Sequence, residues 1–292
     1  MSANRVIAVV VVVLASAAGA AAPRAPAEDV RAATPTTGPA PTWTIARLQA
    51  ALGPRSPLAV YAVGPYVLAT DIEQEQACRF VEELLPVRES ICRAFLGHDA
   101  ARPVALYYLA TPRSYADTIR RRGLPAPPSA TSVYCPETLE IFIRDDRRVY
   151  GAACRETARA LLDEDFAGKP VPAWFVEGFA AVFEWPVLAG EGRYAGGPGP
   201  RFEALRRQGA IPLERLLASG DPAALEPTAR FFCLYLDERR LLAPLYRALR
   251  RASAPDPGGR AALEATTGAP LAELDARFRT WLAALEAVPG PR

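Results

Sequence analysis

The sequence predicts an α+β protein: a small mixed or antiparallel sheet with its helices, followed by an all-helical half. Short apolar, β-rich runs alternate with amphipathic stretches through residues 45–148, whereas residues 149–288 show helical periodicity with short breaks. Half of the 292 residues are hydrophobic, which is enough to bury a substantial core.

The N-terminus has the pattern of a signal peptide, which we place at residues 1–20. Arg5 supplies the positive region, Val6–Ala15 is apolar, and small residues at 18–20 form a cleavage site. We therefore expect an exported protein, periplasmic or secreted, with no membrane span in the mature chain. An uncleaved anchor is the alternative, although a span needs about 20 apolar residues. Residues 21–44, rich in Ala, Pro and Thr, predict a disordered linker.

The part from residue 45 to residue 148 is expected to contain the sheet. Apolar runs predict strands at Leu58–Val63, Tyr66–Thr70, Pro103–Ala110, Thr131–Tyr134 and Thr138–Ile143, the last two as a hairpin. Asp71 is expected to cap a helix that reaches about Phe95, with Gly97 just past its end. Thr111-Pro112 should open a second helix. We interpret the three arginines at its end, 120–122, as a solvated helix terminus.

Two helices of the second part carry an unusual set of charges. The first, Tyr150–Leu162, contains Arg155 and Arg159 on one face and Glu156 at its border. Pro172 is placed as the first residue of the next helix. That helix is apolar on every side up to Phe183, apart from Glu177.

A helix that is apolar all round is normally buried, and a buried carboxylate needs a cation or a proton. The short loop Asp163–Val171 allows the two helices to fold back on each other. We therefore predict that Glu177 reaches the face of Arg155 and Arg159. The alternative is that these are surface ion pairs of little energetic weight.

The two segments resemble the active-site motifs of the peptidase MA-like domains of exported bacterial proteins, a gluzincin-type zinc metallopeptidase family. Residues 155–159 read R-E-T-A-R, in the place of H-E-x-x-H, and residues 174–180 read W-F-V-E-G-F-A, in the place of W-x-x-E-G-x-A. A closing helix at Leu271–Leu285 adds a weaker likeness. The resemblance implies a gluzincin-like fold.

In that family two histidines and a glutamate hold zinc, and a second glutamate is the general base. The resemblance assigns Arg155 and Arg159 to the histidine positions, Glu177 to the third ligand and Glu156 to a vestigial general base. A guanidinium has no lone pair to donate to a metal. His98, the one histidine of the chain, cannot replace both ligands. The resemblance therefore implies that zinc is lost, with no cofactor, no metal and no catalytic residue, and a candidate cleft at Glu156 and Trp174.

The functional expectation is a gluzincin-like pseudoenzyme that has lost zinc and peptidase activity and has a binding or scaffolding role toward an unknown protein or peptide. A zinc ion carries a charge of +2, and two arginines together carry the same charge. We therefore expect Arg155 and Arg159 to lie against Glu156 and Glu177. Two alternatives stay open: a hydrolase that uses Glu156 and Glu177 without zinc, and an anion-binding protein that uses Arg155 and Arg159.

Composition limits other functions. The net charge is +2 and no basic tract interleaves with aromatics, so we expect no nucleic-acid partner. Cys78 and Cys92 on one predicted helix are about 21 Å apart at 1.5 Å per residue, so they cannot bridge each other. We expect buried thiols and leave the pairing open among Cys78, Cys92, Cys135, Cys154 and Cys233. His98 is interpreted as a solvated turn residue.

Overall fold

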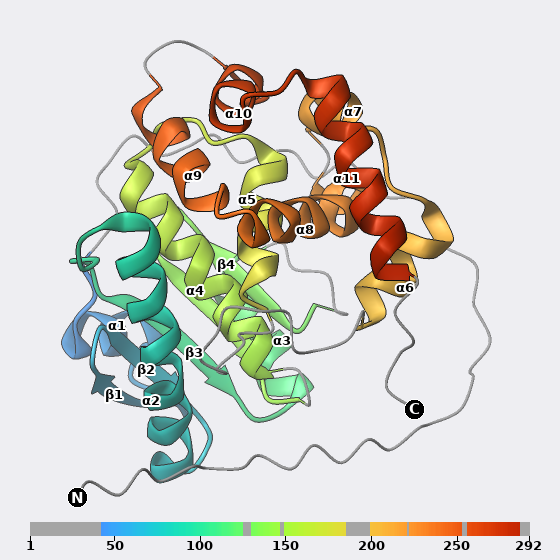
Figure 1. The fold of residues 1–292 in the computed structure, drawn as a ribbon. Helices are drawn as coiled ribbons and strands as arrows, with labels where there is room; N and C mark the ends of the chain where they lie inside the picture. The colour runs from blue at the N-terminus through green and yellow to red at the C-terminus, as the bar shows by residue number, and fades with distance from the viewer. Residues whose placement is uncertain are drawn as a thin grey trace, which may run out of the picture. The chain divides into compact units, whose positions relative to one another are not determined.

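The computed structural model describes residues 42–124, 130–146, 149–184, 199–220, 222–252 and 256–286, which belong to one compact unit (Figure 1). The expected signal peptide, residues 1–20, lies outside the described residues, as does the expected linker up to residue 41. None of the described helices is long and apolar enough to cross a membrane.

A five-stranded mixed sheet is formed by the described residues. Its strands are β1 (Ala59–Val63), β2 (Tyr66–Thr70), β3 (Val104–Leu109), β4 (Ser132–Cys135) and β5 (Glu140–Arg144), in the spatial order β1-β2-β3-β5-β4. The pairs β1–β2 and β4–β5 are antiparallel hairpins, and β3 runs parallel to both β2 and β5. These strands confirm the five apolar runs predicted from the sequence.

Helices flank the sheet and make up the second half of the described chain. They are α1 (Ile45–Leu52), α2 (Gln74–Ile91) with a π-helical turn (Cys92–Leu96), α3 (Pro112–Arg121), α4 (Val149–Phe166), α5 (Ala173–Val182), α6 (Gly199–Gln208), α7 (Leu213–Ala218), α8 (Pro222–Glu238), α9 (Leu242–Arg251), α10 (Arg260–Thr267) and α11 (Leu271–Glu286). The predicted order, mixed elements first and helices afterwards, is therefore correct, and the fold is α+β.

The sheet separates two hydrophobic cores because successive strand residues point to opposite faces. Leu106 and Tyr108 of β3 face a large core shared with α2, α4, α5, α8 and α9. Tyr107 and Leu109 face a smaller core closed by α1 and α3. The larger core is the one that surrounds the charged helices α4 and α5.

Three expectations for the N-terminal part need correction. Trp43 is buried, and its indole nitrogen donates to the carbonyl of Thr138 at 2.6 Å, so the fold starts before the expected linker end at residue 44. Asp71 does not cap α2: its carboxylate accepts from the amide of Ala110, and Glu73 caps the helix. At residue 43 the burial of the large indole ring outweighs the local sequence pattern. At residue 71 the backbone amide of Ala110 does so, because it binds the Asp71 carboxylate.

The third correction concerns Arg122 at the end of α3. Instead of a solvated terminus, its guanidinium donates to Glu140 at 2.8 Å. Glu140 is buried and also accepts from the hydroxyls of Tyr107 and Thr138. A buried carboxylate requires donors, and this requirement draws Arg122 toward the sheet.

Candidate functional site

The candidate site lies where α4 and α5 pack against each other. A left-handed turn at Ala167 and Gly168, with φ of 49° and 80°, follows α4. The chain then folds back, and Pro172 occupies the N-cap position of α5, one residue before the predicted place. The predicted contact between the two helices is therefore confirmed.

The four charged residues of the two motifs meet in one cluster. Arg155 donates to Oε2 of Glu177 at 2.9 Å, and Arg159 donates to the same oxygen at 2.5 Å. Arg159 also donates through its other terminal nitrogen to Glu156 at 3.1 Å. The geometry differs from the parallel bidentate pairs that guanidinium groups favour. The two arginines converge on one oxygen because they lie one turn apart on the same face of α4.

The cluster is largely removed from water. Glu156 is 2% exposed and Glu177 is 8% exposed. Burial acts to lower the pKa of Arg159, but the carboxylates of Glu156 and Glu177 outweigh it, and the pKa lies above its usual value. The arginine is therefore charged at every accessible pH, and the surface-pair alternative does not hold.

Two residues that the sequence analysis did not single out border Glu156. Ser132, on β4, donates its hydroxyl to Oε1 of Glu156 at 2.8 Å. Tyr115, on α3, is buried, and burial together with the charge of Glu156 raises its pKa to about 12. Neither residue lies within a motif, so only the tertiary structure brings them near Glu156: β4 packs against α4, and α3 packs on the sheet.

Trp174 and Gly178 have packing roles. Trp174 is 1% exposed, packs against Phe232 with the two rings tilted, and donates from its indole nitrogen to the carbonyl of Gly258 at 2.9 Å. A Cβ at Gly178 would lie 2.5 Å from the carbonyl oxygen of Ala229, so glycine is required for α8 to approach α5. Both side chains of the predicted cleft, Glu156 and Trp174, are thus buried by neighbouring elements.

The cysteines are free thiols, with four buried and Cys78 partly buried. Cys154 precedes the motif on α4 and is fully buried, and burial raises its pKa to about 12. Such a thiol is neutral and poorly suited to bind a metal. Within the described residues no group of three or more His, Cys, Asp and Glu side chains is arranged to hold a metal ion.

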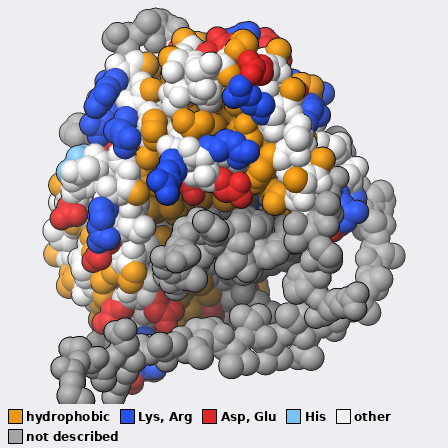
Figure 2. Space-filling model, in the orientation of Figure 1, with side chains coloured by type: hydrophobic (Ala, Val, Ile, Leu, Met, Phe, Trp, Pro, Cys, Tyr) orange, Lys and Arg blue, Asp and Glu red, His pale blue; other side chains and the backbone are white. Residues whose placement is uncertain are grey.

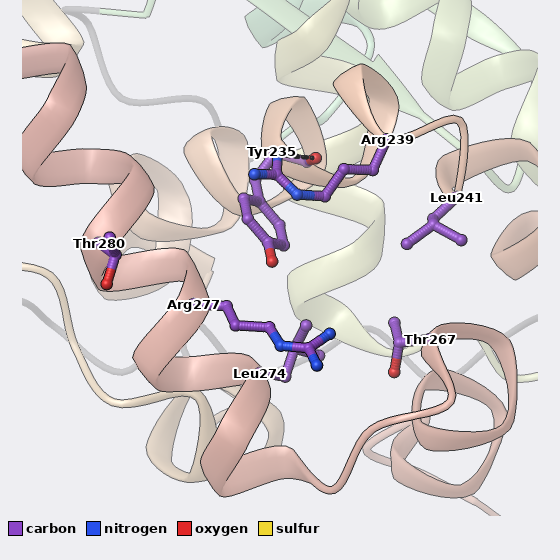
Figure 3. A pocket seen from close by; sticks show the side chains of 7 residues that line it. All are labelled: Tyr235, Arg239, Leu241, Thr267, Leu274, Arg277 and Thr280. Carbon is purple, nitrogen blue, oxygen red and sulfur yellow. Dashed lines mark hydrogen bonds between the residues drawn. The ribbon is translucent and has the colours of Figure 1, made fainter.

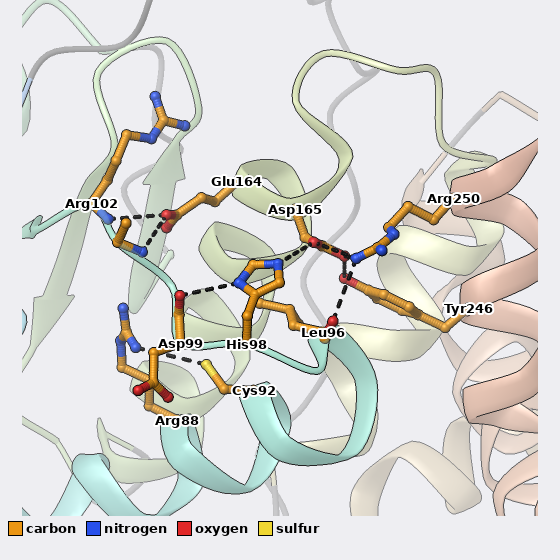
Figure 4. Close-up of polar contacts among 11 residues, drawn as sticks. Arg88, Cys92, Leu96, His98, Asp99, Arg102, Glu164, Asp165, Tyr246 and Arg250 are labelled. Carbon is orange, nitrogen blue, oxygen red and sulfur yellow. Dashed lines mark hydrogen bonds and ion pairs between the residues drawn. The ribbon is translucent and has the colours of Figure 1, made fainter.

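A second polar cluster lies at the C-terminal end of α4 (Figure 4). The carboxylate of Asp165 contacts His98 at 3.0 Å, the hydroxyl of Tyr246 at 2.8 Å and the guanidinium of Arg250 at 2.8 Å. His98 is thus more than a solvated turn residue, although its side chain is 55% exposed. The cluster ties the loop after α2 to α4 and α9.

No family model matches this chain, and no curated protein matches it. The resemblance to gluzincins stays a prediction from the two sequence motifs.

Proposed function

We propose that this protein is an exported, gluzincin-like pseudoenzyme in which an ion-pair cluster stands where a peptidase would hold zinc, and that it has a binding or scaffolding role. The order of the elements along the chain supports the proposal, because it is the order expected for a gluzincin. A small sheet comes first, then a helix with R-E-T-A-R, and then a helix with W-F-V-E-G. The buried packing of Trp174 and the close helix approach at Gly178 support the proposal, because they give the second motif a role in packing that needs no catalysis.

The observation that carries the proposal is the position of Arg159 between Glu156 and Glu177. A zinc ligand must offer a lone pair, and a guanidinium offers only donors. The oxygen of Glu177 that would face the metal accepts from two guanidinium groups. The formal charges of the two arginines and two glutamates cancel, as an ion and its carboxylates would. The carboxylate of Glu156 accepts hydrogen bonds from Arg159 and from Ser132 in this arrangement.

The two alternative functions receive less support from the same contacts. A glycosidase-like hydrolase needs a carboxyl group directed at its substrate as a proton donor, whereas Glu156 and Glu177 are both directed at Arg159. An anion clamp needs guanidinium groups directed at a ligand, whereas Arg155 and Arg159 are directed at Glu177. The pseudoenzyme is therefore the function we retain.

Metal analysis tests the proposal directly. Purified protein, incubated with zinc and desalted, is expected to retain well under one zinc per chain by elemental analysis. A variant with both Arg155→His and Arg159→His restores the imidazoles beside Glu177 and is expected to bind about one zinc per chain. The matched control is Arg155→Gln with Arg159→Gln, which removes the same charges without supplying ligands.

Two outcomes would overturn the proposal. Stoichiometric zinc in the unaltered protein would show that the arginines do not replace the ion. Zinc-dependent peptide hydrolysis that disappears in Glu156→Gln would show that catalysis persists. Export is tested separately by N-terminal sequencing of the mature protein, for which we expect a start at Ala21.

A further inference from the structure

A pocket of about 310 Å³ opens among the C-terminal helices, away from the α4–α5 cluster (Figure 3). Its lining comes from the end of α8, the short connection between α8 and α9, the end of α10 and one face of α11. The lining residues are Tyr235, Arg239, Leu241, Thr267, Leu274, Arg277 and Thr280. The volume is at the lower end of the range for small-molecule sites.

Tyr235 carries a hydroxyl group that has no hydrogen-bond partner among the residues that the structure describes. The residue is 2% exposed, and its ring packs against Phe278 and Trp281. None of the hydrogen bonds among the described residues involves its hydroxyl, which lines the pocket and points into it in Figure 3. The ring is buried, but the hydroxyl oxygen itself is not enclosed and is reached from the pocket. This hydroxyl is therefore available to a ligand.

Two arginines give the pocket a positive lining. The guanidinium of Arg239 lies over the Tyr235 ring at 3.9 Å from its centroid, and Arg277 faces the pocket from α11. Arg277 is paired with Glu273 one turn away, but this pair is solvent-exposed, so a ligand can compete for the guanidinium at little cost. The lining contains no carboxylate.

The ends of α8 and α10 lie beside the pocket, and helix C-termini disfavour anions. Their last carbonyls are, however, occupied by donors of the chain. Arg239 donates to the carbonyl of Tyr235, and the hydroxyl of Thr267 donates to the carbonyl of Leu263. The amide of Gly268 donates to the carbonyl of Glu264. Each guanidinium group also faces a glutamate, Arg239 at 3.7 Å from Glu238 and Arg277 at 2.5 Å from Glu273, and both pairs are exposed enough for an anion to compete with them.

Leu241 and Leu274 add apolar side chains to the lining, and in Figure 3 Leu274 lies next to Arg277 on α11. In Figure 2, Lys and Arg side chains lie next to hydrophobic surface over the C-terminal helices. A ligand that uses both features has an anionic end for Arg277 and Tyr235 and an apolar body for the leucines. We propose that this pocket binds small organic carboxylates with an apolar body. The proposal is independent of the pseudoenzyme assignment, because it uses no residue of α4 or α5.

Calorimetric titration with phenylacetate tests the proposal on the full mature chain. Three probes define the chemistry: phenylacetamide keeps the shape without the charge, acetate keeps the charge without the apolar body, and inorganic phosphate is an anion of another class. Phenylacetate is expected to bind more tightly than each of them by about tenfold or more, because a hydrogen bond to a charged group and apolar burial both contribute.

Variants locate the site. Tyr235→Phe removes one hydroxyl and keeps the ring, and Arg277→Gln removes one charge. Each is expected to weaken phenylacetate binding by about tenfold. The matched control is Arg279→Gln, which breaks the equivalent exposed pair with Asp275 on the same helix and should change affinity by less than about twofold.

Three results would overturn the proposal: no phenylacetate binding, equal affinity for phenylacetamide or phosphate, or unchanged affinity in both pocket variants. Thermal unfolding of each variant separates lost binding from lost folding. Tyr235→Phe keeps the ring contacts with Phe278 and Trp281, so it should remain folded even if Arg277→Gln does not.

Discussion

Arg159 on α4 and Glu177 on α5 are joined by a 2.5 Å contact, and the same guanidinium also holds Glu156 of its own helix. One guanidinium therefore contacts two buried carboxylates and links two helices, and Arg155 supplies the second positive charge. Removing one member leaves the others buried with unbalanced charge, which costs more than the pair contributes in net stability.

Glu177→Gln is predicted to lower the free energy of unfolding by about 3 kcal/mol, because two guanidinium groups lose their shared carboxylate in a site with little water. Urea denaturation monitored by circular dichroism measures the change. Glu203→Gln serves as control, since its exposed pair with Arg206 should contribute less than about 0.5 kcal/mol. Equal, small losses in both variants would contradict the buried cluster.

Gly178→Ala is predicted to destabilise the fold by about 2–3 kcal/mol, because the added methyl group would push α8 away from α5. The new Cβ would lie 2.5 Å from the carbonyl of Ala229 and 2.6 Å from the sulfur of Cys233. Gly220→Ala has open space around its Cβ and should change stability little. A stable Gly178→Ala protein with an unchanged melting temperature would refute the close approach of the helices.

His98 is predicted to make stability depend on pH near neutrality. Its two ring nitrogens face the carbonyl of Asp99 and the carboxylate of Asp165, which are both acceptors. The charged imidazolium fits this site better than the neutral ring, because only the imidazolium can donate from both nitrogens. The Asp99 carbonyl and then Asp165 raise the pKa of His98. A raised pKa in the folded state stabilises the fold below the unfolded value of about 6.5, and this contribution is lost as the pH rises through the folded value.

The expected effect is a decrease of less than about 1 kcal/mol in unfolding free energy between about pH 6 and pH 8, since the imidazole is half exposed. His98→Gln should remove this slope, and the difference between the two proteins isolates it from other titrations. Because the chain has one histidine, proton NMR can follow the imidazole without overlap. Equal pH slopes in the two proteins would disprove the contribution.

The thiols are predicted to divide into one reactive and four protected groups. Cys78 is partly buried, whereas Cys92, Cys135, Cys154 and Cys233 are buried, and burial raises the pKa of Cys154 to about 12. Ellman's reagent at neutral pH should label about one thiol per folded chain at an appreciable rate. In denaturant without reductant it should label all five. Three labelled thiols under those conditions would indicate a disulfide.

The sequence alone was sufficient for features that depend on neighbouring residues. The strands, the Thr111 cap of α3 and the left-handed Gly97 after α2 follow from local propensity and backbone geometry. The meeting of Arg155, Arg159 and Glu177 was also predictable. An apolar helix with a single carboxylate requires a cation, and a short loop limits where that cation can be.

Features that depend on distant residues could not be predicted. Ser132 reaches Glu156 from a strand, and Arg122 turns toward buried Glu140, because the packing of whole elements decides which donors are near. The burial of Trp174 and the position of the Tyr235 hydroxyl at the pocket likewise result from how α5, α8 and α11 approach one another. The amino-acid order determined which charges needed partners. The tertiary structure decided which partners they found, since contacts between elements are set by shape and close packing that no local pattern encodes.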